Sequence, residues 1–174
     1  MPYSGPRLVI SPTASSGCTT MLQVRDRRFQ TVQGVTEMDA KALNILVVDD
    51  DEVDVMNVMR AFKKMNITNA LYEAPNGVEA LKMLRSNAVP AERRLVLLDI
   101  NMPRMSGIEF LQEVRKDPAL KSLSVIVLTT SNADRDRFEA YELNVAGYLV
   151  KPVSFVDFVE LMAALNRFWT LVEI

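Results

Sequence analysis

Five charged or polar residues stand directly after short apolar runs that lie far apart in the chain. They are Asp49, Asp50, Asp99, Thr129 and Lys151. Carboxylates held close together repel one another, and a hard divalent cation such as Mg²⁺ relieves that repulsion. A carboxylate is also a competent nucleophile toward phosphorus, and a lysine can neutralise the oxygens of a transferred phosphoryl group. The set predicts Mg²⁺-dependent phosphoryl chemistry if the fold brings the five residues together.

The apolar runs before these residues have the length and composition of buried strands. Runs at 43–48, 71–74, 95–98, 125–128 and 148–150 are continuous rather than alternating, as is typical of parallel strands covered on both faces. Segments with helical spacing follow them, at about 54–65, from 76, from about 106 to 117, at 134–143 and at 154–169. We expect an α/β fold with a doubly wound, five-stranded parallel sheet and helices on both faces. The carboxyl ends of the strands then share one edge, where ligands bind.

Composition excludes several other kinds of chemistry. The chain of 174 residues contains no histidine, which excludes Ser-His-Asp triads, Cys-His pairs and a phosphohistidine in this chain. The single cysteine, Cys18, excludes an internal disulfide and a cysteine-based zinc site. A formal charge of −2 argues against nucleic acid as a partner. No apolar run is long enough to cross a membrane and no signal-peptide core is present, so we expect no membrane partner and a cytoplasmic location.

The first forty residues differ in composition from the rest of the chain. They are rich in Ser, Thr, Gly and Pro, show no sustained period and carry a net positive charge, whereas the remainder is net negative. We therefore divide the chain into residues 1–40 and a folded domain at 41–174. The first segment is expected to be either a disordered tail or an over-called start of the reading frame.

Four motifs in a fixed order resemble the receiver domain of two-component response regulators. They are LVVDD at 46–50, LLDINMPRMSG at 97–107, VLTT at 127–130 and GYLVKP at 147–152. The resemblance extends over about residues 43–170, nearly everything after the first segment. It implies a flavodoxin-like sheet with strand order 2-1-3-4-5 and a signalling switch rather than an enzyme with an external substrate.

The resemblance also assigns roles to the acidic residues. It implies that Asp99 accepts the phosphoryl group, and that Asp50 and Asp99 bind Mg²⁺ directly while Asp49 assists. The backbone carbonyl of Asn101 is the implied further ligand. Gly107 is expected to allow the turn after Pro103. Because the chain has no histidine, the phosphoryl group is expected to come from a separate histidine kinase.

The remaining motif residues are assigned to the response. The resemblance implies that Thr129 contacts the phosphoryl group, that Lys151 pairs with it, and that Tyr148 is the aromatic switch partner of Thr129. It further implies a cis Lys151–Pro152 bond, which suits a tight turn. Thr130 departs from the family pattern, because many receivers have alanine there, and it leaves the lifetime of the phosphorylated state open.

The C-terminus indicates how the signal is passed on. Few residues follow the last predicted helix and they form no DNA-binding module, so output through protein–protein contact is expected. Residues 168–174 are unusually apolar, which predicts a homodimer through the last helix and this tail. The alternative is that Trp169 and Leu171 fold back onto the domain's own core. This layout resembles small regulators that partner phytochrome-type histidine kinases.

Two other functions compete with this interpretation. Asp49 and Asp51 fit the nucleophile motif of haloacid-dehalogenase-type phosphatases, although that reading lacks a later acidic pair and leaves Asp99 without a role. A receiver-like scaffold that never takes up phosphate is the second alternative. The complete acidic set argues against such a scaffold.

Overall fold

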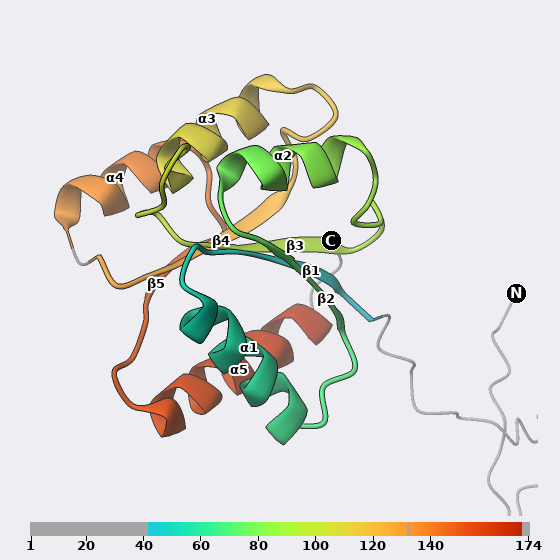
Figure 1. Cartoon of the computed structure of the whole chain (residues 1–174), viewed down its shortest axis with the longest axis vertical. Helices are drawn as coiled ribbons and strands as arrows, with labels where there is room; N and C mark the ends of the chain where they lie inside the picture. Colours follow the sequence, from blue (N-terminus) through green and yellow to red (C-terminus); the bar gives the residue numbers. More distant parts are fainter. Residues whose placement is uncertain (1–41, 132, 172–174) are drawn as a thin grey trace, which may run out of the picture. The chain divides into compact units, whose positions relative to one another are not determined.

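The computed structural model describes residues 42–131 and 133–171, in which strands and helices alternate (Figure 1). The strands are β1 (Asn44–Val48), β2 (Ala70–Ala74), β3 (Arg94–Leu98), β4 (Ser124–Thr129) and β5 (Gly147–Val150). The helices are α1 (Glu52–Lys64), α2 (Gly77–Arg85), α3 (Gly107–Lys116), α4 (Asp134–Glu142) and α5 (Phe155–Leu171). The predicted segment 1–40 and the last three residues of the predicted tail lie outside the described residues.

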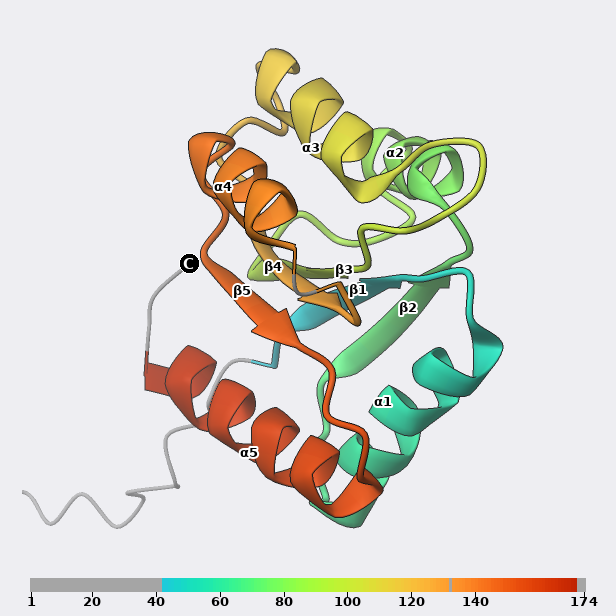
Figure 2. The same cartoon turned by 90° about the vertical axis from the view of Figure 1, so that its left-hand side faces the viewer.

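The five strands form one parallel sheet with the order β2-β1-β3-β4-β5. Helices α2, α3 and α4 cover one face of the sheet, and α1 and α5 cover the other (Figure 2). The expected α/β fold, with its doubly wound flavodoxin-like sheet and helices on both faces, is therefore confirmed.

The continuous apolar runs produce this arrangement because successive side chains of a strand point to opposite faces. In β1, Leu46 and Val48 pack under α2 and α3, whereas Ile45 and Val47 pack under α1 and α5. All four side chains are almost completely buried. A strand that serves two cores needs an apolar residue at every position, which the sequence of β1 provides.

Polar caps fix the starts of the first three helices. Asp51 accepts a hydrogen bond from the Val53 N–H and caps α1, Asn76 caps α2, and Ser106 forms a capping box with Glu109 at α3. The cap at Asp51 makes α1 begin at Glu52, two residues before the predicted start. Asp51 itself remains exposed.

The last helix extends into the predicted apolar tail as far as Leu171. Trp169 is only 3% exposed and packs in the core beneath α1 and α5, whereas Leu171 remains 81% exposed. The alternative in which both residues fold back is thus correct for Trp169 and wrong for Leu171. A helix turns by about 100° per residue, so neighbouring apolar residues need not share a face. Within the described part of the chain, no helix is long and apolar enough to cross a membrane.

Candidate functional site

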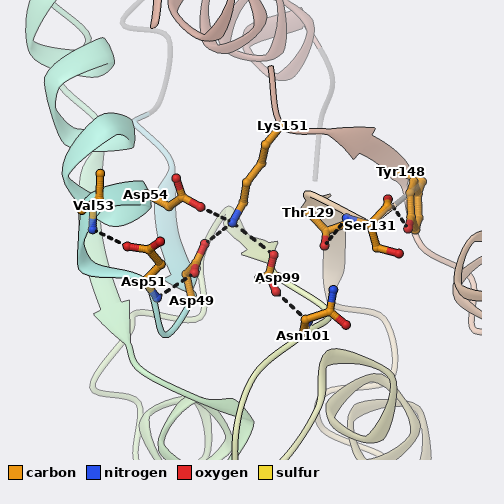
Figure 3. A network of polar contacts seen from close by, with 10 residues as sticks. All are labelled: Asp49, Asp51, Val53, Asp54, Asp99, Asn101, Thr129, Ser131, Tyr148 and Lys151. Carbon is orange, nitrogen blue, oxygen red and sulfur yellow. Dashed lines mark hydrogen bonds and ion pairs between the residues drawn. The ribbon is translucent and has the colours of Figure 1, made fainter. Parts of the chain in front are cut away.

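The sheet register brings the predicted site residues to one edge. Val48 of β1 pairs with Leu98 of β3, so Asp49 and Asp99 each follow immediately after paired positions. On the other side of β3, β4 and β5 are paired through Thr129 and Val150, and Lys151 follows. Figure 3 shows the resulting group of side chains. The most distant pair in sequence, Asp49 and Lys151, is 102 residues apart.

The ammonium group of Lys151 lies at the centre of this group. Its Nζ is 2.7 Å from Asp49 Oδ2, 2.7 Å from Asp54 Oδ2 and 3.1 Å from Asp99 Oδ1. Only 6% of the lysine side chain is exposed. Burial alone lowers the pKa of Lys151. The hydrogen bonds to Asp49 and Asp54, with the charges of Asp49 and Asp99, outweigh burial and raise the pKa above its ordinary value. The lysine therefore stays charged.

The Asp49 carboxylate is almost completely buried, with 8% of the residue exposed. Burial raises its pKa above the ordinary value, against the opposing effects of Lys151 and of the Asp51 N–H, which donates to Asp49 Oδ1 at 3.0 Å. Such a carboxylate gains from a nearby cation, because the cation offsets the lost hydration of the charged form.

The Asp99 carboxylate is held from two sides. The Asn101 N–H donates to Asp99 Oδ2 at 2.6 Å, while Lys151 contacts the other oxygen. The loop after Asp99 returns so closely that a Cβ on Gly107 would lie 2.3 Å from the Asp99 carbonyl oxygen. Glycine is required there for close approach of two backbone segments, which extends its predicted role in the turn.

The four predicted metal-binding residues are only partly brought together. Asp49 and Asp99 meet around one cation, the ammonium of Lys151, and oxygen ligands of this kind suit Mg²⁺. Asp50 is exposed and lines an adjoining groove of about 490 Å³. In the described residues, no group of three or more His, Cys, Asp or Glu side chains is arranged to hold a metal. The donor chemistry thus fits a hard cation, with Lys151 seated between two of the donors.

Asp54 is the site residue that sequence reasoning missed. It lies in the first turn of α1 and its carboxylate contacts Lys151 as closely as that of Asp49 does. A usable signal was present, because a helix that follows a strand directly begins at the carboxyl edge of the sheet. An acidic residue in its first turn can therefore reach the strand-end residues.

Thr129 and Tyr148, the predicted switch pair, are connected through Ser131. The Thr129 hydroxyl, fully buried, accepts a hydrogen bond from the Ser131 N–H at 3.2 Å. The Tyr148 hydroxyl donates to the Ser131 carbonyl at 3.0 Å (Figure 3). Burial is the main cause that raises the pKa of Tyr148 above its ordinary value. Tyr148 is half-buried in this arrangement and anchored to the loop after β4.

Two sequence expectations need correction or restriction at this site. The described residues contain no cis peptide bond, so the Lys151–Pro152 bond is trans. The two isomers of a bond before proline differ little in free energy, and a motif alone does not determine which one forms. Asp51 caps α1 and does not join the group around Lys151, which removes the second carboxylate of the phosphatase reading.

Comparison with known proteins identifies a family. The model of the response regulator receiver domain matches residues 45–165. The probable methanogenesis regulatory protein FilR2 of Methanothrix harundinacea is 35% identical over 130 residues, which cover 72% of this chain and 82% of FilR2. The response regulator Rcp1 of Synechocystis sp. is 33% identical over 128 residues, covering 72% of this chain and 87% of Rcp1.

Solved structures agree with these relatives. The phosphorylated cyanobacterial phytochrome response regulator RcpA superimposes with a TM-score of 0.67 at 30% identity, over 74% of this chain and 94% of RcpA. The Mn²⁺-bound form of Rcp1 gives a TM-score of 0.65 at 32% identity, over 75% and 96% of the two chains. One of these relatives is thus phosphorylated and the other holds a divalent cation.

Proposed function

This chain belongs to the receiver-domain family of response regulators, and from that premise we propose that it accepts a phosphoryl group on Asp99 from a histidine kinase. The observation that carries the proposal is the pairing of a buried Asp99 carboxylate with the Lys151 ammonium, 3.1 Å away at the carboxyl edge of the sheet. We propose the cytoplasm as the location.

In the proposed reaction, an Asp99 oxygen attacks the phosphorus of a phosphohistidine on the kinase. A new P–O bond forms, the P–N bond breaks, and its electron pair returns to the imidazole nitrogen. Lys151 pairs with the oxygens of the transferred group, and the Thr129 hydroxyl donates a hydrogen bond to one of them. Both residues already lie at the same edge as Asp99. The product is an acyl phosphate on this chain, and because the 174 residues contain no histidine, the proposed phosphohistidine lies outside them.

The proposed cofactor is Mg²⁺, held by the carboxylates of Asp49, Asp50 and Asp99 and by the Asn101 carbonyl. When bound, it supplies charge neutralisation for the phosphoryl oxygens. Support comes from the oxygen-only donor set and from the Mn²⁺-bound form of Rcp1. The carboxylates of Asp49 and Asp99 both contact the Lys151 ammonium, so the fold already holds two of the proposed ligands close together.

The proposed output is a change of protein contacts around α4, β5 and α5, controlled by Thr129 and Tyr148. Phe138 and Tyr141 of α4 are exposed on that side, at 67% and 52%. Exposed aromatic residues favour contact with a protein partner. The protein acts as a switch whose only chemistry is its own phosphorylation and dephosphorylation.

The proposed partners include a second copy of this chain and a phytochrome-type kinase. With Trp169 buried, the dimer contact through α5 rests on Phe168 and Leu171, which are 56% and 81% exposed. The phytochrome link is supported by the similarity to RcpA, whose structure is that of a phytochrome response regulator.

Phosphorylation of the purified protein tests the main proposal. A small-molecule phosphoryl donor with Mg²⁺ is expected to label the wild-type chain with an acid-stable, hydroxylamine-labile acyl phosphate, and Asp99→Asn is expected to abolish the label. Asp134→Asn, an exposed aspartate of α4, is the matched control and should be labelled normally. Label retained in Asp99→Asn would contradict the assignment, and no label in the wild type would favour the inert scaffold.

Metal and mass measurements test the finer proposals. Removal of Mg²⁺ with a chelator should abolish labelling, and Asp50→Asn should raise the Mg²⁺ concentration needed for half-maximal labelling. Light scattering should detect a dimer that Leu171→Glu dissociates. Val153→Glu, a substitution of another exposed apolar residue that lies outside the proposed contact, should leave the dimer intact. A monomer at micromolar concentration, with and without the phosphoryl donor, would rule out the proposed dimer.

A further inference from the structure

Helix α4 has little apolar contact with the rest of the domain. Ala140 is its one buried residue among those described, and Phe138 and Tyr141 face solvent. Its N-cap residue, Ala133, makes no side-chain hydrogen bond to the free N–H groups of the first turn. Its position therefore depends on polar contacts made by neighbouring segments.

Arg115 of α3 holds the C-terminal end of α4. Its Nε donates to the Leu143 carbonyl at 2.7 Å, and a terminal nitrogen donates to the Asn144 carbonyl at 3.0 Å. The other terminal nitrogen donates to the carbonyls of Lys121 and Leu123 before β4. Four carbonyls from two segments thus converge on one guanidinium, which fixes this end of the helix.

The N-terminal end of α4 is held by Ser131 instead. The Ser131 hydroxyl donates to Asp136 Oδ2 at 2.6 Å, in the first turn of the helix. The guanidinium of Arg137, one residue further along, lies over the Tyr148 ring, 5.6 Å from its centroid. These two side chains connect the start of α4 to the loop after β4 and to β5.

Ser131 also contacts Ala133 and the two predicted switch residues. The Ala133 N–H donates to the Ser131 hydroxyl at 3.4 Å. The Ser131 N–H donates to the Thr129 hydroxyl and its carbonyl accepts from the Tyr148 hydroxyl (Figure 3). One residue therefore uses its N–H, its carbonyl and its side chain to connect Thr129 and Tyr148 to the start of α4. Any displacement of Thr129 that moves Ser131 must also act on the hydrogen bond to Asp136.

We propose that the Ser131–Asp136 hydrogen bond holds α4 in the resting position, so that Ser131 couples the Thr129 hydroxyl to the N-terminal end of this helix. The inference rests on the proposed function, in which Thr129 moves toward a phosphoryl group on Asp99. That movement shifts Ser131 and strains its contact with Asp136, while Arg115 keeps the far end of α4 in place. Ser131 and Asp136 are positioning residues that oppose the phosphorylated arrangement.

The direction of a change in affinity tests this coupling. With Mg²⁺ present, Asp136→Ala and Ser131→Ala should each bind the phosphoryl analogue beryllofluoride about two- to tenfold more tightly than the wild type, the range set by one ordinary hydrogen bond. The double variant should gain no more than either single one. Ser131→Thr, which keeps a hydroxyl, should restore the wild-type affinity.

Asp134→Ala is the matched control, because it also removes one acidic residue from the first turn of α4. The Asp134 side chain is 99% exposed, and its ion pair with Arg137, at 3.7 Å, does not involve Ser131, so the affinity of Asp134→Ala for beryllofluoride should stay at the wild-type value. Hydrogen exchange gives a second readout at the Arg137 N–H, which bonds to the Ala133 carbonyl. Beryllofluoride should speed this exchange in the wild type. In Asp136→Ala, the exchange should already be fast without beryllofluoride.

Each outcome separates the coupling from the function beneath it. Weaker or unchanged beryllofluoride affinity in both Ser131→Ala and Asp136→Ala overturns the coupling. Loss of a contact that merely supports the structure is not expected to tighten binding, whereas loss of a contact that opposes the phosphorylated arrangement is. Equal tightening by Asp134→Ala overturns it as well, since charge alone would then explain the effect. Failure of the wild type to bind beryllofluoride with Mg²⁺ refutes the proposed function and the coupling together.

Discussion

Helices α3 and α4 lie next to each other on one face of the sheet but are held by different kinds of contact (Figure 2). In α3, the capping box of Ser106 and Glu109 satisfies the first turn, and Phe110, Leu111 and Val114 are fully buried. In α4, the cap is absent and the burial is confined to one alanine.

This difference indicates that α3 is fixed in place and that α4 can move. Helix α3 follows the loop of Asp99, and its burial keeps that loop in place through Gly107. Helix α4 follows Thr129, and its N-terminal end is held by the hydrogen bond from Ser131 to Asp136, which water can replace at small cost in free energy. The site thus has a rigid side, where chemistry is proposed, and an adjustable side, where the response is proposed.

The largest expected effect compares one phenylalanine from each helix. Phe110→Ala should lower the free energy of unfolding by about 3–5 kcal/mol, because a fully buried aromatic ring leaves a cavity. Phe138→Ala in α4 should change it by about 0.5 kcal/mol or less. Denaturant unfolding of the two variants measures both values. Similar losses in the two would mean that α4 is packed as firmly as α3.

The next effect concerns the end of α4 that is held by a charged side chain. Arg115→Ala should cost about 2–3 kcal/mol of unfolding free energy, because hydrogen bonds from a partly buried guanidinium are lost. Arg135→Ala, which removes an 86% exposed arginine of α4, is the control and should change little. A neutral result for Arg115→Ala would show that α4 is held by something other than its C-terminal end.

Exchange of the caps tests the contrast at the N-terminal ends. Ser106→Ala should destabilise the protein by about 1 kcal/mol, because α3 loses its capping box. Ala133→Ser should instead stabilise it by about 0.5–1 kcal/mol, because the first turn of α4 gains a missing acceptor. Thermal unfolding monitored by circular dichroism can resolve both shifts. The two substitutions should change the stability in opposite directions. A loss of stability in both would mean that α4 does not accept a cap.

The smallest effect is a pH dependence confined to α3. The hydrogen bond from the Ser106 N–H, and then that from its hydroxyl, lower the pKa of Glu109 below its ordinary value of 4.5. A carboxyl with a lowered pKa stabilises the folded state above its unfolded value and loses this contribution as pH falls through the folded value. The stability advantage of the wild type over Glu109→Gln should therefore shrink below pH 4.5. Glu113→Gln serves as the α3 control, and an advantage that persists in acid would contradict the capping role.

Periodicity was sufficient for the sheet and for the location of the site. Continuous apolar runs such as Leu46–Val48 predict strands buried on both faces, and parallel strands place Asp49 and Asp99 at one edge. Both inferences depend only on the direction of side chains along a strand. They therefore required no knowledge of which side chains pair with which.

The pairings themselves depend on distances that no spacing rule supplies. Which acids contact Lys151 depends on where α1 begins, and the cap at Asp51 brings Asp54 into reach. The role of Ser131 depends on the path of a loop, because its backbone makes two of its three key contacts. Whether Trp169 or its neighbour Phe168 faces the core depends on the rotation of α5 about its own axis. The structure buries Trp169 and leaves Phe168 exposed.

The burial of Trp169 also gives the protein a built-in optical probe. The sequence has one tryptophan, and its indole packs with Leu43 and Leu95 where the strands begin, at the edge opposite Asp99. Indole fluorescence of this protein consequently comes from a single shielded emitter at the far end of the sheet. A shift in its emission when Asp99 reacts would report a structural signal that has crossed the whole domain.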